Sequence, residues 1–225
     1  MGIEPDYESD FDIKDPPPML KTWLSAVTKP TVENFRSIAA HEMANLNTAS
    51  QWYLIALIIA AFLNLILGFI ITTLGIDDWS VVGYAIALAR KNIFVAGGTG
   101  ILFIGIQACM IPIEILITTI VLMFENWLAD KVGGDGSFES FVYLCIAWKA
   151  PLVILLPFFY QIPTISPYAI AVNYLLQAFY TVKTLLAIKQ LSVKKSLFVA
   201  LSPAIFLLGI GIIQGIFYGI VYPAS

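Results

Sequence analysis

Charged residues are scarce in this sequence and are missing altogether from long stretches of it. Only 12% of the residues are charged, whereas 59% are hydrophobic. A helix needs about 20 mostly apolar residues to cross the hydrocarbon core of a bilayer, and in lipid a helix satisfies its own backbone groups. The scarcity of charge excludes a soluble fold and predicts an all-α, polytopic membrane protein. The apolar runs cover residues 43–76, 92–113, 138–160, 168–188 and 196–222.

Metal-binding and nucleophilic side chains are also few. The chain has one histidine, His41, and two cysteines, Cys109 and Cys145. These groups are too few for a Zn²⁺ cluster, and His41 falls in a predicted interfacial helix, where it is most simply a surface residue and not the base of a Ser-His-Asp set. A haem or pigment would lack histidine ligands, although water or backbone carbonyls could substitute for them. The two cysteines fall at different predicted depths, whereas the Cα atoms of bridged cysteines lie within about 7 Å. We therefore predict no enzyme activity, no metal site, no cofactor and no disulfide.

The N-terminal part of the chain divides into two regions by composition. Residues 1–18 contain six of the fifteen acidic residues and end in three prolines, so we expect a disordered acidic tail. Residues 19–49 contain two short amphipathic patterns, one with Trp23 and one with Phe35. These patterns predict two helices. They either lie in the cytoplasmic interface of the membrane, anchored by the two aromatic rings, or pack on the inner end of the bundle.

We expect residues 50–225 to form a domain of five transmembrane helices. Their predicted positions are residues 51–74, 100–126, 138–160, 168–188 and 196–222. Cytoplasmic segments of membrane proteins are enriched in Lys and Arg. With the N-terminus in the cytoplasm, nine basic residues lie in inner segments and only Arg90 and Lys91 lie in outer ones. The charge distribution therefore predicts a cytoplasmic N-terminus and a C-terminus outside.

A glycine-rich segment joins the second predicted span to the third. It contains Gly133, Gly134 and Gly136, followed directly by Ser137. Glycines at this spacing permit a tight turn with left-handed backbone, and the serine can cap the next helix. A phosphate-binding loop is the alternative, but it requires a different glycine spacing and a following lysine. We predict a structural turn.

This turn and its surroundings resemble the prokaryotic branch of the Yip1 family of integral membrane proteins. Residues 133–138 read Gly-Gly-Asp-Gly-Ser-Phe, and the helix after them carries the step Ala150-Pro151. Residues 180–203 and the entry segment from Trp23 to Phe35 are similar to the family as well. The resemblance implies five spans with a cytoplasmic N-terminus, in the plasma membrane of a prokaryote.

One departure from the family limits what the resemblance implies about partners. Eukaryotic members that associate with Rab GTPases carry an Asp-Leu-Tyr-Gly-Pro type motif, and this chain has no such motif. The resemblance therefore implies neither a Rab partner nor a trafficking role.

Polar residues inside the predicted spans are the candidates for a functional site. Two sets fall on one side of their helices at helical spacing. Either set could line a solute path, or it could supply hydrogen bonds between helices, and the sequence alone favours hydrogen bonds between helices. The sets are Gln107, Glu114, Thr118 and Glu125 on the second span, and Asn173, Gln177, Tyr180 and Thr184 on the fourth.

Glu114 and Lys149 are a candidate intramembrane pair. Each lies 11 residues from the loop that joins the second and third spans, which puts both about 16 Å from that end of the helices. An unpaired charge at this depth costs about 2.5–3.5 kcal/mol on insertion scales. We expect the two charges to pair. The alternative is that Lys149 extends toward the interface while Glu114 is protonated.

The last span carries a candidate packing interface. Gly211, Gly215 and Gly219 form a tandem GxxxG pattern, which lets another helix backbone approach closely. That helix could belong to this chain or to another membrane protein.

Two functions are compatible with these features. The first, which the sequence favours, is a non-catalytic scaffold or accessory subunit that packs against lipid, quinone or another integral membrane protein. The second is a transporter of a small solute or ion that uses Glu114 and Lys149. Nothing in the sequence indicates a nucleic-acid partner.

Overall fold

A computed structural model describes residues 18–73, 93–160 and 165–221, and within these ranges it has seven helices and no strand. The all-helical prediction is therefore confirmed. Pro18, assigned above to the acidic tail, is the first helical residue, and the rest of that tail lies outside the described residues. The helices are α1 (Pro18–Thr28), α2 (Val32–Ala39), α3 (Leu46–Thr73), α5 (Ile93–Lys131), α6 (Phe138–Tyr160), α7 (Ser166–Ile188) and α8 (Val193–Val221).

Within the described residues, three of the long helices contain a segment that is apolar enough to cross a membrane. Judged by length and composition, these segments are Leu46–Gly68, Ala108–Lys131 and Phe138–Phe159. This result confirms the helical membrane class but not the predicted number of five spans. α6 and α7 begin within two residues of the predicted positions. α3 begins five residues earlier than predicted, because the side-chain oxygen of Asn45 accepts a hydrogen bond from the Thr48 N–H at 2.9 Å and caps the helix.

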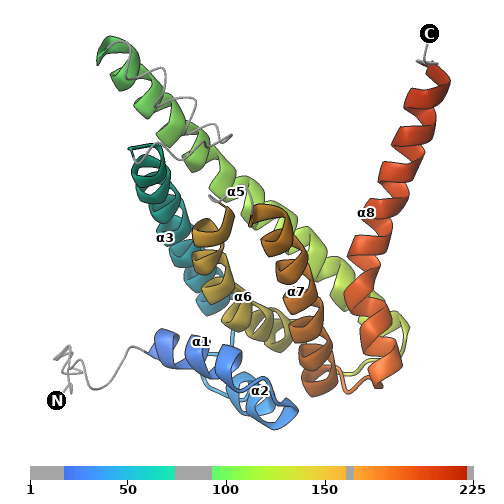
Figure 1. Cartoon of the computed structure of the whole chain (residues 1–225). Helices are drawn as coiled ribbons and strands as arrows, with labels where there is room; N and C mark the ends of the chain where they lie inside the picture. The colour runs from blue at the N-terminus through green and yellow to red at the C-terminus, as the bar shows by residue number, and fades with distance from the viewer. Residues whose placement is uncertain (1–17, 74–92, 161–164, 222–225) are drawn as a thin grey trace, which may run out of the picture.

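The two short helices lie across one end of the bundle (Figure 1). Trp23 is 3% exposed and meets Trp52 of α3 edge to face, with 6.4 Å between ring centroids. Phe35 is fully buried and stacks on Tyr180 of α7, whose hydroxyl donates a hydrogen bond to the Val27 carbonyl at 2.8 Å. Of the two expected arrangements, packing on the bundle is the one observed. Trp23 and Phe35 contact the protein itself, and a position of these helices in the membrane interface stays a prediction.

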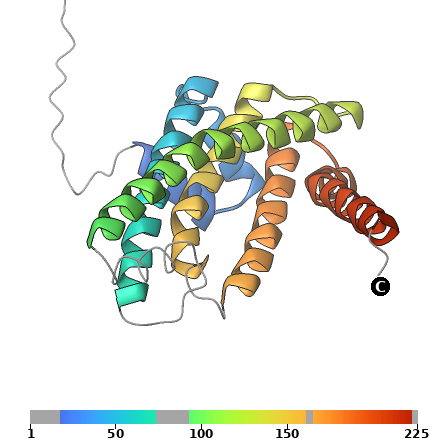
Figure 2. The ribbon, with the colours of Figure 1, turned by 90° about the horizontal axis from the view of Figure 1, so that it is seen from above.

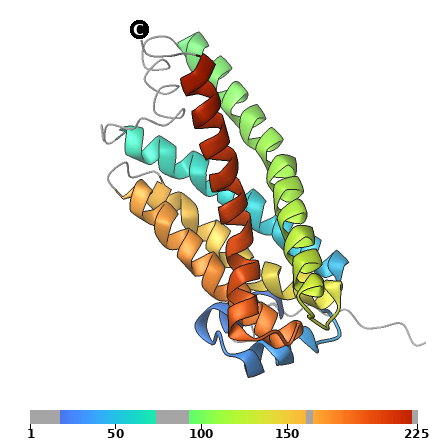
Figure 3. The same ribbon diagram turned by 90° about the vertical axis from the view of Figure 1, so that its right-hand side faces the viewer.

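Contacts between neighbours connect the five long helices in a ring, which is open where α8 diverges from α5 and α7 (Figure 1). α3 packs on α6, α6 on α7, α7 on α8, α8 on α5, and α5 on α3. Figure 2 shows α3, α6 and α7 side by side, with α5 running across them. Figure 1 shows α5 and α8 converging toward the end that carries α1 and α2 and spreading apart toward their other ends, and Figure 3 shows the same two helices from the side. The five long helices therefore surround a common central space, although neighbours around it are not always consecutive in the chain.

The glycine-rich segment between α5 and α6 forms a tight turn against the end of α7. Gly133 has a φ of +92°, a left-handed conformation that favours glycine. At Gly136 no side chain fits, because a Cβ atom would collide with the Ile188 carbonyl oxygen. Ser137 caps α6, since its hydroxyl accepts a hydrogen bond from the Ser140 N–H at 3.1 Å. These contacts agree with a structural turn rather than a phosphate-binding loop.

Candidate functional site

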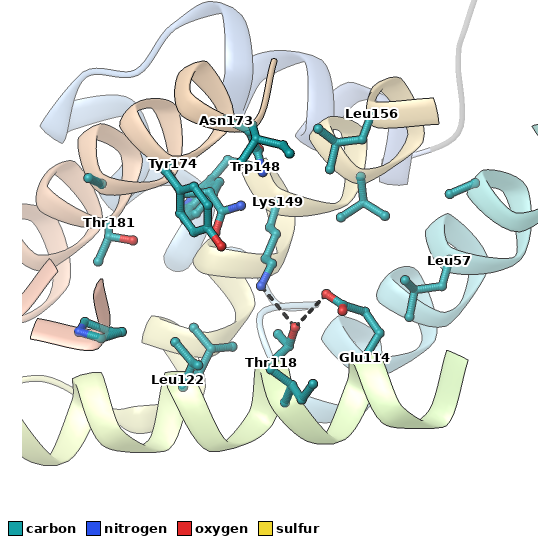
Figure 4. A pocket seen from close by; sticks show the side chains of 18 of the residues that line it. Leu57, Glu114, Thr118, Leu122, Trp148, Lys149, Leu156, Asn173, Tyr174 and Thr181 are labelled. Atoms are coloured by element: carbon teal, nitrogen blue, oxygen red, sulfur yellow. Dashed lines mark hydrogen bonds between the residues drawn. The ribbon is translucent and has the colours of Figure 1, made fainter. Parts of the chain in front are cut away.

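A cavity of about 940 Å³ lies inside the ring of long helices. All five helices of the ring contribute residues to its wall, which is mostly apolar. The volume lies near the upper end of the range for small-molecule sites. Figure 4 shows the polar residues that interrupt this wall, on α5 below and on α6 and α7 above.

A hydrogen-bonded network on one side of the cavity joins the two charges that the sequence singled out. The Lys149 ammonium of α6 donates a hydrogen bond to the Thr118 hydroxyl of α5 at 3.0 Å. That hydroxyl lies 2.9 Å from the hydroxyl of Tyr53 on α3 and 3.4 Å from Glu114 Oε1. Tyr53 itself donates to Glu114 Oε1 at 3.1 Å. The Lys149 ammonium also lies 5.8 Å from the centre of the Tyr53 ring, within cation–π range.

The network connects Glu114 and Lys149 through hydroxyl groups. The sequence predicted that the two side chains meet at one depth, and the structure brings both to the Thr118 hydroxyl (Figure 4). No direct ion pair between them occurs among the contacts of the described residues. These hydrogen bonds can form together when the lysine donates to the threonine, the threonine donates to the tyrosine, and the tyrosine donates to the carboxylate. A positive and a negative charge are thus linked across three helices.

A second carboxylate, that of Glu125, lies in the wall of the same cavity, about three turns after Glu114 on α5. It is 5% exposed, and within the described part of the chain it makes no hydrogen bond. The sequence placed Glu125 on the same side of the helix as Glu114 and Thr118, and all three do line the cavity.

The predicted polar set on α7 divides into two parts. Asn173 and Gln177 line the cavity. Tyr180 instead binds the Val27 carbonyl, and Thr184 accepts a hydrogen bond from the Trp148 indole at 3.1 Å. The first two residues thus belong to the wall of the cavity, whereas the last two hold helices together.

Some polar residues of the cavity wall and one residue of the hydrogen-bonded network were not predicted. Thr181 lies four residues after Gln177 and lines the cavity, and this spacing could have identified it. Tyr174 also lines the cavity, but no periodicity distinguishes it from other aromatic residues. Tyr53 was missed because an isolated tyrosine in an apolar helix carries no pattern.

Other predicted residues cannot be placed with respect to the cavity. The side chain of Gln107 and the surroundings of Gly211, Gly215 and Gly219 lie outside the described residues, although α5 and α8 include these positions. Within the described ranges, no three His, Cys, Asp or Glu residues lie close enough together to hold a metal ion.

No protein-family model, curated protein or solved structure matches this chain. The resemblance to the Yip1 family therefore stays a prediction, and the function is argued from the site.

Proposed function

We propose that this protein is a transporter that binds a small solute in the cavity lined by its five long helices. One observation carries the proposal: charged residues from two helices face a cavity of about 940 Å³ in a protein otherwise built from apolar helices. Ionisable groups within a membrane are costly, and they usually mark a pathway for a substrate or an ion.

The cost of these charges favours a binding function over a purely structural one. A scaffold could use apolar residues where Glu114, Glu125 and Lys149 stand and would avoid removing three ionisable groups from water. A solute-binding site gains polar contacts from the same groups. Asn173 and Gln177 on α7 add neutral hydrogen-bonding groups to the wall of the cavity.

A second cavity supports a route through the protein. It has a volume of about 570 Å³ and lies between α3, α5 and α6. Thr118 and Leu122 line both cavities, and Tyr53 lines the second. The contact between Tyr53 and Thr118 therefore separates the first cavity from the second. Alternating access requires a barrier of this kind that side-chain or helix movement can open.

The same proposal includes five spans, with the N-terminus in the cytoplasm and the C-terminus outside. It is supported by the lengths of α7 (23 residues) and α8 (29 residues), which suffice to cross a bilayer. The excess of basic residues in the inner segments supports the orientation.

The test is ligand-dependent stabilisation of the purified protein in lipid nanodiscs. A panel of amino acids, organic cations, organic acids and neutral sugars is compared on the wild type, Ala204→Phe and Ala108→Phe. Both alanines are exposed, but Ala204 on α8 lines the cavity, whereas Ala108 on α5 does not belong to its wall. A ligand at about 100 times its Kd should stabilise the wild type by about 2.7 kcal/mol. Ala108→Phe should respond equally and Ala204→Phe should not. If no solute class stabilises the wild type, the proposal is wrong.

An accessory-subunit function is the second proposal, and the glycine pattern of α8 favours it. If Gly211, Gly215 and Gly219 contact a helix of a partner, Gly215→Leu should separate the two backbones. The variant should lose a membrane protein that copurifies with the wild type in mild detergent. Unchanged copurification and unchanged thermal stability would rule out an interface at this position.

A further inference from the structure

We propose that the cavity takes an organic cation with an apolar body, and that Glu125 binds its positive charge in exchange for a proton. This inference rests on the transport function proposed above and specifies its class of substrate.

The charge balance of the cavity is the first argument. Three ionisable groups that carry charge line it: Glu114, Glu125 and Lys149. The ammonium of Lys149 is linked through Thr118 and Tyr53 to Glu114, so that one positive and one negative charge offset each other. Glu125 is then the surplus carboxylate. An isolated ionised carboxylate in apolar surroundings is unfavourable, and it is relieved by a proton or by a bound cation.

The residues around Glu125 leave its carboxylate accessible to a ligand in the cavity. Among the described residues, Lys149 is the one charge of opposite sign that acts on it, and the ammonium of that lysine is hydrogen-bonded to Thr118. From α6 the buried thiol of Cys145 also faces Glu125. From α7 the titratable residue in the wall is Tyr174, and the α8 residues in the wall carry no charge. Within the described part of the chain, Glu125 thus forms no ion pair or hydrogen bond of its own, which leaves its carboxylate for a cationic ligand.

The rest of the wall fits the apolar body of such a ligand. Aliphatic and aromatic side chains make up most of it, among them Leu57, Val121 and Val153. Trp148 and Tyr174 lie in the same wall, and aromatic rings attract cations through their π faces. A small, strongly hydrated metal ion would instead need several oxygen ligands, whereas Glu125 has no hydrogen-bonded oxygen neighbour in the described part of the chain.

The exchange of a proton for the cation follows from the need to keep the cavity electrically neutral. Without ligand, Glu125 holds a proton. When the cation binds, the proton leaves the carboxyl group for water and the carboxylate pairs with the cation, so the charge of the cavity is unchanged. Affinity for the cation should therefore fall about tenfold for each pH unit below the titration midpoint of Glu125.

The experiment measures binding of tetraphenylphosphonium to the full-length protein in nanodiscs between pH 5 and pH 9. Tetraphenylborate, an anion of the same shape, controls for partition into apolar surfaces. The variants are Glu125→Gln, Glu125→Asp and, as a matched control, Glu139→Gln, which alters an exposed glutamate at the start of α6. Size-exclusion profiles and unfolding temperatures verify that each variant is folded.

We expect saturable binding of tetraphenylphosphonium to the wild type, with one proton released per cation and no binding of tetraphenylborate. Glu125→Gln should lose at least tenfold in affinity together with the pH dependence, Glu125→Asp should keep the pH dependence, and Glu139→Gln should match the wild type. Equal binding of both probes, or unchanged binding by Glu125→Gln, would overturn the inference.

The result also separates this inference from the function on which it rests. If tetraphenylphosphonium does not bind but another solute stabilises the wild type and not Ala204→Phe, the cation specificity is wrong and the binding function stands. If no solute binds, both are wrong.

Discussion

The ammonium of Lys189 lies 2.7 Å from the carboxylate of Asp130, and the lysine side chain is only 1% exposed. The same ammonium donates a hydrogen bond to the Gly136 carbonyl at 2.6 Å. Lys189 follows the last residue of α7, whereas Asp130 and Gly136 flank the turn between α5 and α6. One buried side chain thus joins two loops that are about 50 residues apart in the sequence, and the N–H of Asp135 returns a bond to the Lys189 carbonyl at 3.0 Å.

Replacing this lysine should destabilise the bundle more than replacing its acidic partner. Lys189→Met removes two charge-assisted hydrogen bonds, and we expect a loss of about 2–3 kcal/mol. Asp130→Asn should lose about 1 kcal/mol, because Asp130 is 51% exposed and the bond to Gly136 remains. Thermal unfolding in detergent measures both, at about 2–4 °C per kcal/mol for a chain of this size. The reverse order of the two variants would contradict this role of Lys189.

Gly136→Ala should destabilise the turn through a steric clash. The added Cβ would meet the Ile188 carbonyl oxygen, which is backbone and cannot move aside without displacing the end of α7. We expect a loss of about 1–3 kcal/mol, measured as a lower unfolding temperature. Gly105→Ala is the matched control, because no atom lies within 4 Å of the Cβ position there. If both variants unfold at the same temperature, the close approach at Gly136 does not constrain the turn.

The Thr118 hydroxyl should carry the coupling between Glu114 and Lys149. Thr118→Val leaves the Lys149 ammonium without its acceptor, and we expect a loss of about 1–3 kcal/mol. Thr119→Val should cost less than about 0.5 kcal/mol, because Thr119 is exposed and bonds only the Ile115 carbonyl of its own helix. Unfolding of both variants in detergent gives these values.

A double-mutant cycle extends this test to the charges themselves. Glu114→Gln and Lys149→Met should each harm stability, and the double variant should cost less than the sum of the two. In the Thr118→Val background the difference should shrink, because the bridge is gone. Strict additivity in both backgrounds would show that the two charges are independent.

Thiol labelling of whole cells should show that the two ends of the chain lie on opposite sides of the membrane. In a chain with Cys109→Ala and Cys145→Ala, a cysteine at Ser225 should react with a membrane-impermeant reagent and one at Asp10 should not. This pattern follows from five spans and a cytoplasmic N-terminus. Labelling of both positions from the same side would require an even number of spans.

The sequence by itself determined the helical membrane class and where most helices lie. Uncharged apolar runs leave a helix as the structure that satisfies its own backbone in lipid, and α6 and α7 accordingly follow their runs closely. The turn at Gly133 and the cap at Ser137 were also predictable, because each depends on residues close to it in the chain. Local patterns determine local structure.

The tertiary structure alone decided which polar faces meet. Periodicity showed that Glu114, Thr118 and Glu125 share one side of a helix. It did not show that α3 would bring Tyr53 to that side, or that Lys149 would bond to Thr118 and not directly to Glu114. It also left open whether Trp23 and Phe35 face lipid or protein, and both face protein. The physical reason is the same in each case: helical spacing defines the direction of a side chain on its own helix, whereas its neighbour is set by how helices far apart in the chain pack together.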